Sequence, residues 1–384
     1  MTATTAVLHS VSSLDAADGG PPLSVSRLCR ELADLEGMSV SLVSQIETGR
    51  ATISPGSPKV KLFLGEAERR GILRLPFRRA LARAMSASAP SILHDHGIWL
   101  PPNHYVATLA RRRGIPLVIH PRGMLEPWAL AHRGWKKRLA LRLYQRRNLE
   151  LAALFFVTAE QELESLRALG LKQPVAIVPN GVDLPPPHVG ERDTRLPRNL
   201  VFLGRIHPKK GLLDLVEALS RVRPSDWRLR FAGPDEGGHL AEVMRRVEVR
   251  GLRDSVEYVG VVEGATKTAL FAGADLFVLP SHSENFGLVV AEALAHGVPV
   301  ITTRATPWKG LEQRGCGWWI EPTADALAEC FRAAFALDPT ALRAMGAKGR
   351  EYAREFHWPT IARQTADVYR WVLGRGSKPG CVVD

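Results

Sequence analysis

The stretch from Ala274 to Pro299, ADLFVLPSHSENFGLVVAEALAHGVP, constrains the fold of this chain more than any other. It opens with the apolar run 276–279, which is typical of a buried strand in a parallel sheet. Pro280 ends the run, and after a polar loop a helix is expected from Phe286 to just before Gly297. Strand, loop and helix in this order predict one unit of an α/β fold.

Two carboxylates flank the start of this helix. Glu284 lies in the loop before it, and Glu292 lies about two turns inside it. If every step between them were helical they would be ~12 Å apart, with the free N–H groups of the helix N-terminus between them. Such a pair suits a long ligand whose middle is anionic. The alternative is that Glu284 caps the helix and Glu292 is a solvated surface residue.

The strand–helix alternation fills two halves of the chain. At 384 residues the chain exceeds the usual size of one hydrophobic core, so two domains are expected. The proline-rich stretch 184–199 is predicted to be the linker between them and one hinge. The prediction is an α/β protein with two Rossmann-like domains, 1–185 and 186–358, whose parallel sheets face across a cleft. An amphipathic helix is expected at 359–376.

The formal net charge of +12 indicates an anionic partner. Nucleic acid, an anionic membrane and phosphorylated small molecules all fit this charge. The sequence has no helix-turn-helix signature, zinc finger or aromatic RNA-binding stretch, so nucleic acid is not expected.

The cysteines and the apolar runs bear on the compartment. Four widely spaced cysteines form no metal-ligand pattern and fit free thiols in a reducing compartment. The N-terminus lacks the pattern of a signal peptide, and the longest apolar run, near 151–157, is much shorter than a membrane span. A soluble, cytoplasmic protein is therefore expected.

The segment 135–147 is basic and rich in leucine. Its leucines alternate with Trp135, Lys136, Lys137, Arg138, Arg142, Arg146 and Arg147. Such a segment can lie on an anionic membrane, which would place the protein peripherally at the inner face of the plasma membrane. It can equally be a solvated helix that packs its leucines inward.

Several polar residues of the first half follow or end predicted strands. His94 and His96 end one strand, Arg122 follows the next, and Gly20 lies in the glycine-containing loop after the first. Ligands of open α/β sheets bind at the carboxyl ends of strands, so these residues are candidates for a binding site. The alternatives are ordinary turn histidines and a tight glycine turn.

In the second half, Arg205 and Lys210 follow the first strand, in the segment GRIHPKKG. Their spacing favours a turn that directs both cations at one diphosphate, where arginine binds two oxygens and lysine adds a point charge. Two solvated surface charges are the alternative. No Asp-x-Asp cluster lies beside them, so the sequence calls for no metal and no other cofactor.

With these residues in place, the chain resembles the retaining glycosyltransferases of family 4. The segment SENFGLVVAEALAHGVPV is similar to their E-x7-E motif, with Glu284 and Glu292 as its two acids. Five further stretches match in order: GGPPLSV (19–25), HDHGIW (94–99), HPRGMLEPW (120–128), VPNGVD (178–183) and GRIHPKKG (204–211). The resemblance implies a GT-B fold with an N-terminal acceptor domain, completed by the last helix, and a C-terminal nucleotide-sugar domain.

The resemblance also implies roles for individual residues. Arg205 and Lys210 would hold the donor diphosphate, Glu284 the donor sugar and Glu292 the ribose. Further donor contacts would come from Gly20 and from the backbone of Asn285, Phe286, Gly287 and Leu288. The acceptor, a glycan or polyprenyl-linked saccharide, would contact His94, His96, Trp99, His120 and Arg122.

One position departs from the family pattern. Many relatives carry a histidine where Arg122 stands, and His120 lies two residues earlier. Arginine cannot act as a base at neutral pH, so its role would be electrostatic or positional, and His120 is the alternative. The function that this implies is sugar transfer with retention from a nucleotide-diphosphate sugar in glycan or surface polysaccharide synthesis. A nucleotide-sugar epimerase and a catalytically silent nucleotide-sugar or polyanion binder are the alternatives.

Overall fold

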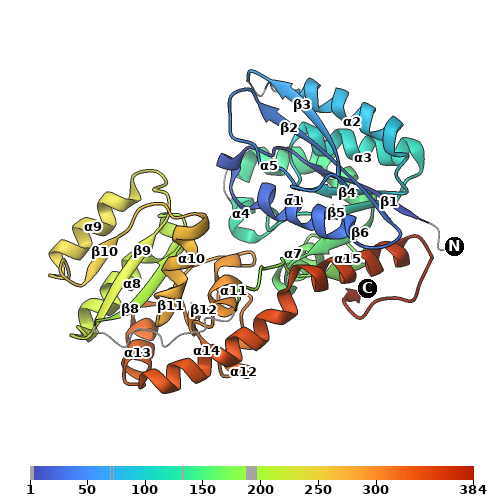
Figure 1. Cartoon of the computed structure of the whole chain (residues 1–384). Helices are drawn as coiled ribbons and strands as arrows, with labels where there is room; N and C mark the ends of the chain where they lie inside the picture. Colours follow the sequence, from blue (N-terminus) through green and yellow to red (C-terminus); the bar gives the residue numbers. More distant parts are fainter. Residues whose placement is uncertain (1–3, 70, 72, 132–133, 187–196) are drawn as a thin grey trace. The chain divides into compact units, whose positions relative to one another are not determined.

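A computed structural model describes residues 4–69, 71, 73–131, 134–186 and 197–384. The chain divides into two compact units, each built on its own sheet (Figure 1). The N-terminal unit comprises Met1–Gly181 and Trp358–Asp384, and the C-terminal unit comprises Val182–His357.

The sheet of the N-terminal unit has the strand order β14-β7-β6-β5-β4-β1-β2-β3 in the described residues. All neighbours pair in parallel except β14 with β7, which are antiparallel. The strands are β1 (Thr5–Val11), β2 (Met38–Glu47), β3 (Lys61–Ala67), β4 (Ile92–His96), β5 (Leu117–His120), β6 (Ala152–Val157), β7 (Val175–Ile177) and β14 (Val382–Val383).

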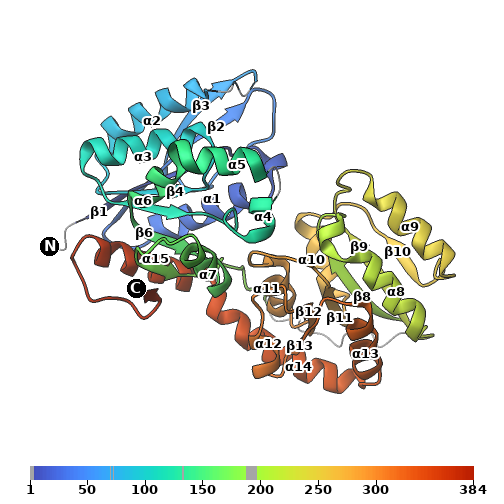
Figure 2. The same cartoon turned by 180° about the vertical axis from the view of Figure 1, so that it is seen from behind.

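Helices cover both faces of this sheet. One face packs against α1 (Gly20–Ala33) and α15 (Trp358–Val372) (Figure 1). The other packs against α2 (Leu75–Ser88) and α3 (Pro101–Arg113) (Figure 2). The remaining helices of the unit are η1 (Ala16–Asp18), α4 (Pro127–Ala131), α5 (Gly134–Ala140), the π-helix η2 (Leu141–Gln145), α6 (Arg146–Glu150) and α7 (Glu160–Ala168).

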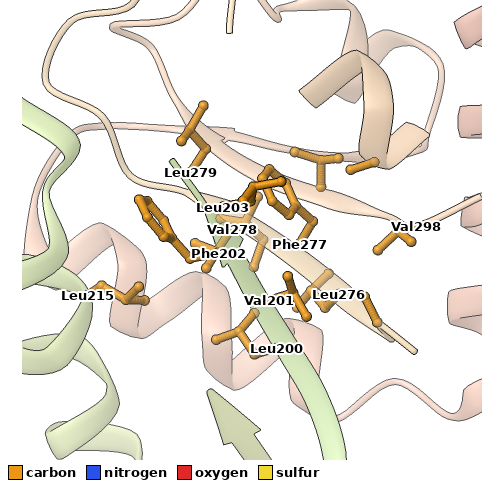
Figure 3. Packing of buried hydrophobic residues seen from close by; sticks show 14 of the residues in the cluster. Leu200, Val201, Phe202, Leu203, Leu215, Leu276, Phe277, Val278, Leu279 and Val298 are labelled. Atoms are coloured by element: carbon orange, nitrogen blue, oxygen red, sulfur yellow. The ribbon is translucent and has the colours of Figure 1, made fainter. Parts of the chain in front are cut away.

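The sheet of the C-terminal unit is parallel throughout, with the order β10-β9-β8-β11-β12-β13. Its strands are β8 (Arg198–Leu203), β9 (Trp227–Ala232), β10 (Val256–Tyr258), β11 (Leu276–Leu279), β12 (Val300–Thr303) and β13 (Gly317–Ile320). Leucine, valine and phenylalanine from β8 and β11 form the centre of its core (Figure 3).

Helices alternate with these strands. They are η3 (Pro208–Lys210), α8 (Leu212–Val222), α9 (His239–Val249), α10 (Gly264–Ala272), α11 (Leu288–Ala295), α12 (Gly310–Gln313), α13 (Ala324–Phe335), α14 (Pro339–Ala353) and η4 (Arg354–Phe356). The α/β class is thus confirmed, with two Rossmann-like sheets that are parallel except for the edge strand β14. Within the described residues, no helix combines the length and apolar composition needed to cross a lipid bilayer.

The chain passes from one unit to the other outside the predicted linker. The chain passes between units at 181/182 and again at 357/358. The Val182 N–H donates to the Phe356 carbonyl at 2.7 Å, and the Arg350 guanidinium donates to the Pro185 carbonyl. Residues 182–186 therefore belong to the C-terminal unit, while 187–196 of the predicted linker lie outside the described residues.

Candidate active site

Two of the residues expected in the donor site, Lys210 and Glu284, meet in the C-terminal unit. Lys210, after β8, donates its ammonium to the carboxylate of Glu284, after β11. The Ser281 hydroxyl lies 3.4 Å from the same carboxylate oxygen. The lysine and glutamate side chains are only 12% and 17% exposed. Because β8 and β11 are neighbours in the sheet, their carboxyl ends place this ion pair where α/β sheets bind ligands.

Close backbone packing fixes this arrangement. Gly211 has φ +69°, and a Cβ there would lie 2.1 Å from the Pro280 carbonyl oxygen, so only glycine fits. Beside it, the His282 N–H donates to the Lys209 carbonyl at 2.8 Å. The loop after β8 is thereby held against the loop after β11.

The helix of the E-x7-E segment begins two residues later than expected. Gly287, at φ +73°, is the N-cap, and α11 starts at Leu288. Phe286 is instead buried against Trp308, whose indole N–H donates to the Phe286 carbonyl at 2.5 Å. The side-chain oxygen of Asn285 is buried with no hydrogen-bond partner in the described residues. This junction therefore offers one unused acceptor and the free N–H groups of a helix start.

Glu292 has a partner that the sequence analysis missed. Lys267 of α10 donates to one Glu292 oxygen at 2.6 Å, and the other oxygen is buried without a partner among the described residues. Burial raises the pKa of the Glu292 carboxyl, and the Lys267 ammonium opposes that shift. No motif marked Lys267 in the sequence. The unpaired oxygen is free to accept a hydrogen bond from a ligand hydroxyl.

The Arg205 side chain does not pair with Glu284, the partner of Lys210. Its guanidinium donates to Glu236, in the loop after β9, at 2.6 Å. The side chains of this pair are 60% and 46% exposed. An ion pair this exposed contributes at most about 1 kcal/mol, so an anionic ligand can displace Glu236 at low cost.

The N-terminal unit gathers four histidines on one face of its sheet. His94 and His96 lie within β4 and His120 ends β5, whereas His9 of β1 was not singled out from the sequence. His9 pairs in register with His94, and His96 with His120. All four are buried rather than placed in turns.

A directional hydrogen-bonded chain runs through three of these histidines. Arginine can only donate, so Arg122 donates to Nδ1 of His96 at 3.0 Å. Neutral His96 must then carry its proton on Nε2, from which it donates to Nδ1 of His9 at 2.9 Å. By the same reasoning, His9 Nε2 donates to the Tyr369 hydroxyl (3.4 Å), which donates to His94 Nδ1 (2.6 Å). These tautomers are assigned from the network.

Burial keeps this cluster neutral. It lowers the pKa of His9 to about 3 and lowers the pKa values of His94, His96 and His120 well below the usual range, with Arg122 adding to each shift. Burial also lowers the pKa of Arg122, to about 10, so the guanidinium remains charged at neutral pH. Both His120 nitrogens and Nε2 of His94 are buried without partners in the described residues.

Arg122 sits in a tight turn at the end of β5. Its φ is +56°, and that of Gly123 is +71°. The Gly123 N–H donates to Glu162 at 2.6 Å, and Thr158 donates to the other oxygen of Glu162 from its backbone and hydroxyl. Arg122 itself donates to the Ser24 hydroxyl of α1 at 2.9 Å. The guanidinium is therefore held in one orientation.

Of the remaining predicted residues, Trp99 lies in the loop after β4 and Gly20 begins α1. Trp99 has φ +79°, with the Lys137 ammonium 5.8 Å from its ring. Gly20 is the exposed first residue of α1. On the opposite face of the sheet, Asp95 accepts from Ser10 and Asn103, and burial raises its pKa to about 7. Asp95 is therefore not part of the hydrogen-bonded histidine cluster.

His9, His94 and His96 form the candidate metal-ligand set among the described residues, with ligand atoms within 4.8 Å of one another. In the hydrogen-bonded chain described above, Nδ1 of each of these histidines already accepts a hydrogen bond through its lone pair. The Arg122 cation, 3.0 Å from His96, further opposes a divalent ion. This donor set therefore does not fit a metal.

Comparisons with known proteins match both halves of the chain to glycosyltransferase families. Residues 19–181 match the glycosyl transferase 4-like domain family, and residues 195–352 match the glycosyl transferases group 1 family. The chain is 31% identical over 404 aligned positions to the D-inositol 3-phosphate glycosyltransferase of Kribbella flavida, covering 92% of this chain and 90% of that protein.

Solved structures show the same architecture. The sucrose-phosphate synthase of Thermosynechococcus elongatus superimposes with a TM-score of 0.76 at 22% identity, over 97% of this chain and 100% of that one. Anabaena HepE, solved in complex with UDP-glucose, gives 0.71 at 18% identity, over 94% and 98%. The chain belongs to the group 1, family 4-type glycosyltransferases of GT-B fold.

Proposed function

We propose that this glycosyltransferase transfers a sugar from a nucleotide-diphosphate sugar to a hydroxyl of a glycan or lipid-linked saccharide, with retention and without a metal. The observation that carries the proposal is the Lys210–Glu284 ion pair at the carboxyl ends of β8 and β11, beside the start of α11. Two comparison proteins support it: one is named as a glycosyltransferase of D-inositol 3-phosphate, and another was solved with UDP-glucose. Surface polysaccharide or glycoconjugate synthesis is the proposed setting.

In this proposal the C-terminal unit binds the donor. Lys210 leaves Glu284 for the diphosphate, and Arg205 leaves Glu236 to bind it as well. Glu284, released from its lysine, accepts hydrogen bonds from the donor sugar, and the unpaired oxygen of Glu292 accepts from the ribose. The backbone of residues 285–288 contacts sugar and phosphate.

The N-terminal unit, completed by α15, binds the acceptor in this proposal. Arg122 supplies a fixed positive charge at the end of β5, and Trp99 contacts the acceptor from the loop after β4. Three histidines support these residues from within the unit as buried, neutral groups: His94, His96 and His120. Gly20, at the exposed start of α1, contacts the donor phosphates.

The reaction breaks the bond between the anomeric carbon and the diphosphate oxygen and forms one to the acceptor oxygen. Negative charge develops on the departing diphosphate, where Lys210, Arg205 and the N-terminus of α11 stabilise it electrostatically. Attack on the face from which the diphosphate leaves gives retention, and the acceptor proton moves to the departing oxygen. No metal is needed, because protein cations neutralise the leaving group.

Peripheral contact with an anionic membrane is also part of the proposal. Trp135, Leu139 and Leu143, spaced four residues apart, are 63%, 50% and 70% exposed. The leucines at 139 and 143 therefore do not pack inward, whereas Leu141 packs against the core. Basic residues of α5 and η2 flank this stripe, a pattern typical of helices that lie in a membrane interface.

A thermal-shift screen against UDP-, GDP-, ADP- and dTDP-sugars, with and without EDTA, tests the donor. The best binder is then assayed for transfer, and NMR of the product's anomeric carbon gives the stereochemistry. Stabilisation that survives EDTA and a product that retains configuration are expected. Binding without transfer to any acceptor would favour a silent binder, and interconversion of the donor sugar alone would favour an epimerase.

A further inference from the structure

The N-terminal unit has a pocket that neither group of residues above uses. It lies between α2 and α3 and has a volume of about 490 Å³. Its lining includes three arginines, Arg78 of α2 with Arg112 and Arg113 of α3. It also includes three apolar side chains, Leu81, Met85 and Leu109. The pocket therefore combines a positive charge with an apolar surface.

No carboxylate compensates the charge of the pocket among the described residues, although the Arg78 guanidinium lies 5.8 Å from the ring centroid of Tyr105. Its lining contains no aspartate or glutamate, and no carboxylate pairs with the three arginines in the described part of the chain. All three arginines are exposed. A guanidinium binds two phosphate oxygens at once, so a phosphate group is the anion that suits them best.

The apolar part of the lining favours a phosphate group that carries a hydrocarbon chain. Leu81 is 4% exposed, whereas Met85 and Leu109 are partly buried at its side. A free inorganic phosphate would gain nothing from these side chains. The start of an acyl chain would bury apolar area against them, at about 25 cal/mol per Å².

The pocket adjoins the segment that carries the exposed Trp135–Leu143 stripe. His104, in its lining, lies 3.2 Å from the Asn148 side-chain oxygen of α6, and its ring meets the Tyr144 ring edge-on. Helices α2, α3 and α5 cover the same face of the N-terminal sheet (Figure 2). The pocket and the helical segment 134–150 therefore lie on the same face of the N-terminal sheet.

We infer that the α2–α3 pocket binds the phosphate headgroup and the first part of an acyl chain of an anionic lipid. This inference rests on the proposed membrane contact and names the lipid chemistry recognised beside it. The three arginines hold the phosphate, while Leu81, Met85 and Leu109 receive the chain. The site is separate from the donor residues, which lie in the C-terminal unit apart from Gly20 at the start of α1, and Gly20 does not line the pocket.

Short-chain phosphatidate, used below its micelle concentration, is the test probe in calorimetry with the full chain. Dihexanoylphosphatidylcholine and inorganic phosphate are the comparison ligands. The double variant Arg78→Ala/Arg112→Ala should bind phosphatidate at least about tenfold more weakly, because two phosphate contacts are lost. The matched control Arg79→Ala/Arg111→Ala removes the same charge from exposed positions on the same helices, outside the lining, and should bind normally.

A second variant leaves the charge unchanged. Ala82 is exposed and lines the pocket, so Ala82→Trp should fill the cavity and also reduce phosphatidate affinity about tenfold. Equal affinity of the pocket and control variants would overturn the inference. Inorganic phosphate binding as tightly as phosphatidate would overturn its lipid part.

Two further measurements separate this inference from the proposed function. Donor stabilisation in the thermal-shift assay should be unchanged in every pocket variant. Sedimentation with phosphatidylcholine vesicles, with and without phosphatidate, shows whether the lipid is taken from a bilayer. Vesicle binding that is identical in Arg78→Ala/Arg112→Ala and its control would leave the membrane contact in place and refute the pocket site.

Discussion

Replacing Lys210 by alanine tests the centre of the proposed donor site. The substitution removes the cation that pairs with Glu284 and that we expect to move onto the diphosphate. Turnover should fall by about 10²–10³, the usual effect of removing one group that stabilises charge developing in a transition state. The Lys209→Ala variant removes the same charge one residue earlier and should retain activity.

The cost in stability can be worked out from the exposure of the pair. Breaking a fully buried ion pair costs about 3–5 kcal/mol, and breaking an exposed one costs about 0–1 kcal/mol. The Lys210 and Glu284 side chains are 12% and 17% exposed, so an intermediate loss of about 1–2 kcal/mol is expected. For a unit of this size, that lowers the unfolding midpoint by about 2–8 °C.

Adding Glu284→Gln separates stability from activity. The double variant Lys210→Ala/Glu284→Gln no longer leaves an unpaired carboxylate, so part of the lost stability should return. Turnover should stay low, because neither the cation nor the carboxylate is restored. Thermal unfolding and steady-state transfer assays with the best donor give both quantities. Turnover of Lys210→Ala within a few fold of the unmodified protein would refute the assignment.

Three more perturbations test other features. Gly211→Ala should lower the unfolding free energy by about 2–4 kcal/mol and weaken donor binding, because its Cβ would meet a carbonyl oxygen. Gly251→Ala, with φ +64° and open space around it, should cost only about 1 kcal/mol in the same denaturant titration. Tyr369→Phe leaves Nδ1 of His94 buried without its donor and should cost about 1–3 kcal/mol. The native state holds its four buried histidines neutral, whereas the unfolded chain protonates them below about pH 6.5. The unfolding free energy should therefore fall as the pH drops from about 6.5 toward 5. The expected decline is up to about 1.4 kcal/mol per pH unit for each histidine. Asp95, Glu162 and Glu292, whose raised pKa values act in the opposite direction, should offset part of this decline. Denaturant titrations at several pH values that show no net decline would contradict this reasoning.

Local patterns in the sequence were sufficient to predict much of the fold. The strand 276–279 was predicted with the bounds that the structure shows, because Pro280 ends the apolar run. The start of α11 was predicted two residues early. Phe286 has the apolar character of a helix face, but its side chain packs against Trp308, which is distant in sequence.

The candidate sites depended more on pairings that a single sequence does not contain. His9 is one polar residue in an apolar strand, and only the placement of β1 beside β4 brings it to His94. Arg205 and Lys210 are close in sequence, yet Glu236 of another loop holds Arg205 at the surface. Spacing predicted that both cations point at one diphosphate, but it could not predict that each would meet a different carboxylate in the structure.

The state of the histidine cluster bears on how an acceptor hydroxyl would lose its proton. His120, the alternative to Arg122 in the family pattern, has a pKa well below its usual range, as do His94 and His96. A group with so low a pKa is a poor base at neutral pH, because it binds the proton too weakly. Arg122 has no lone pair to offer and remains charged. The proton therefore needs another acceptor, and the departing diphosphate oxygen is the one that the proposed reaction itself supplies.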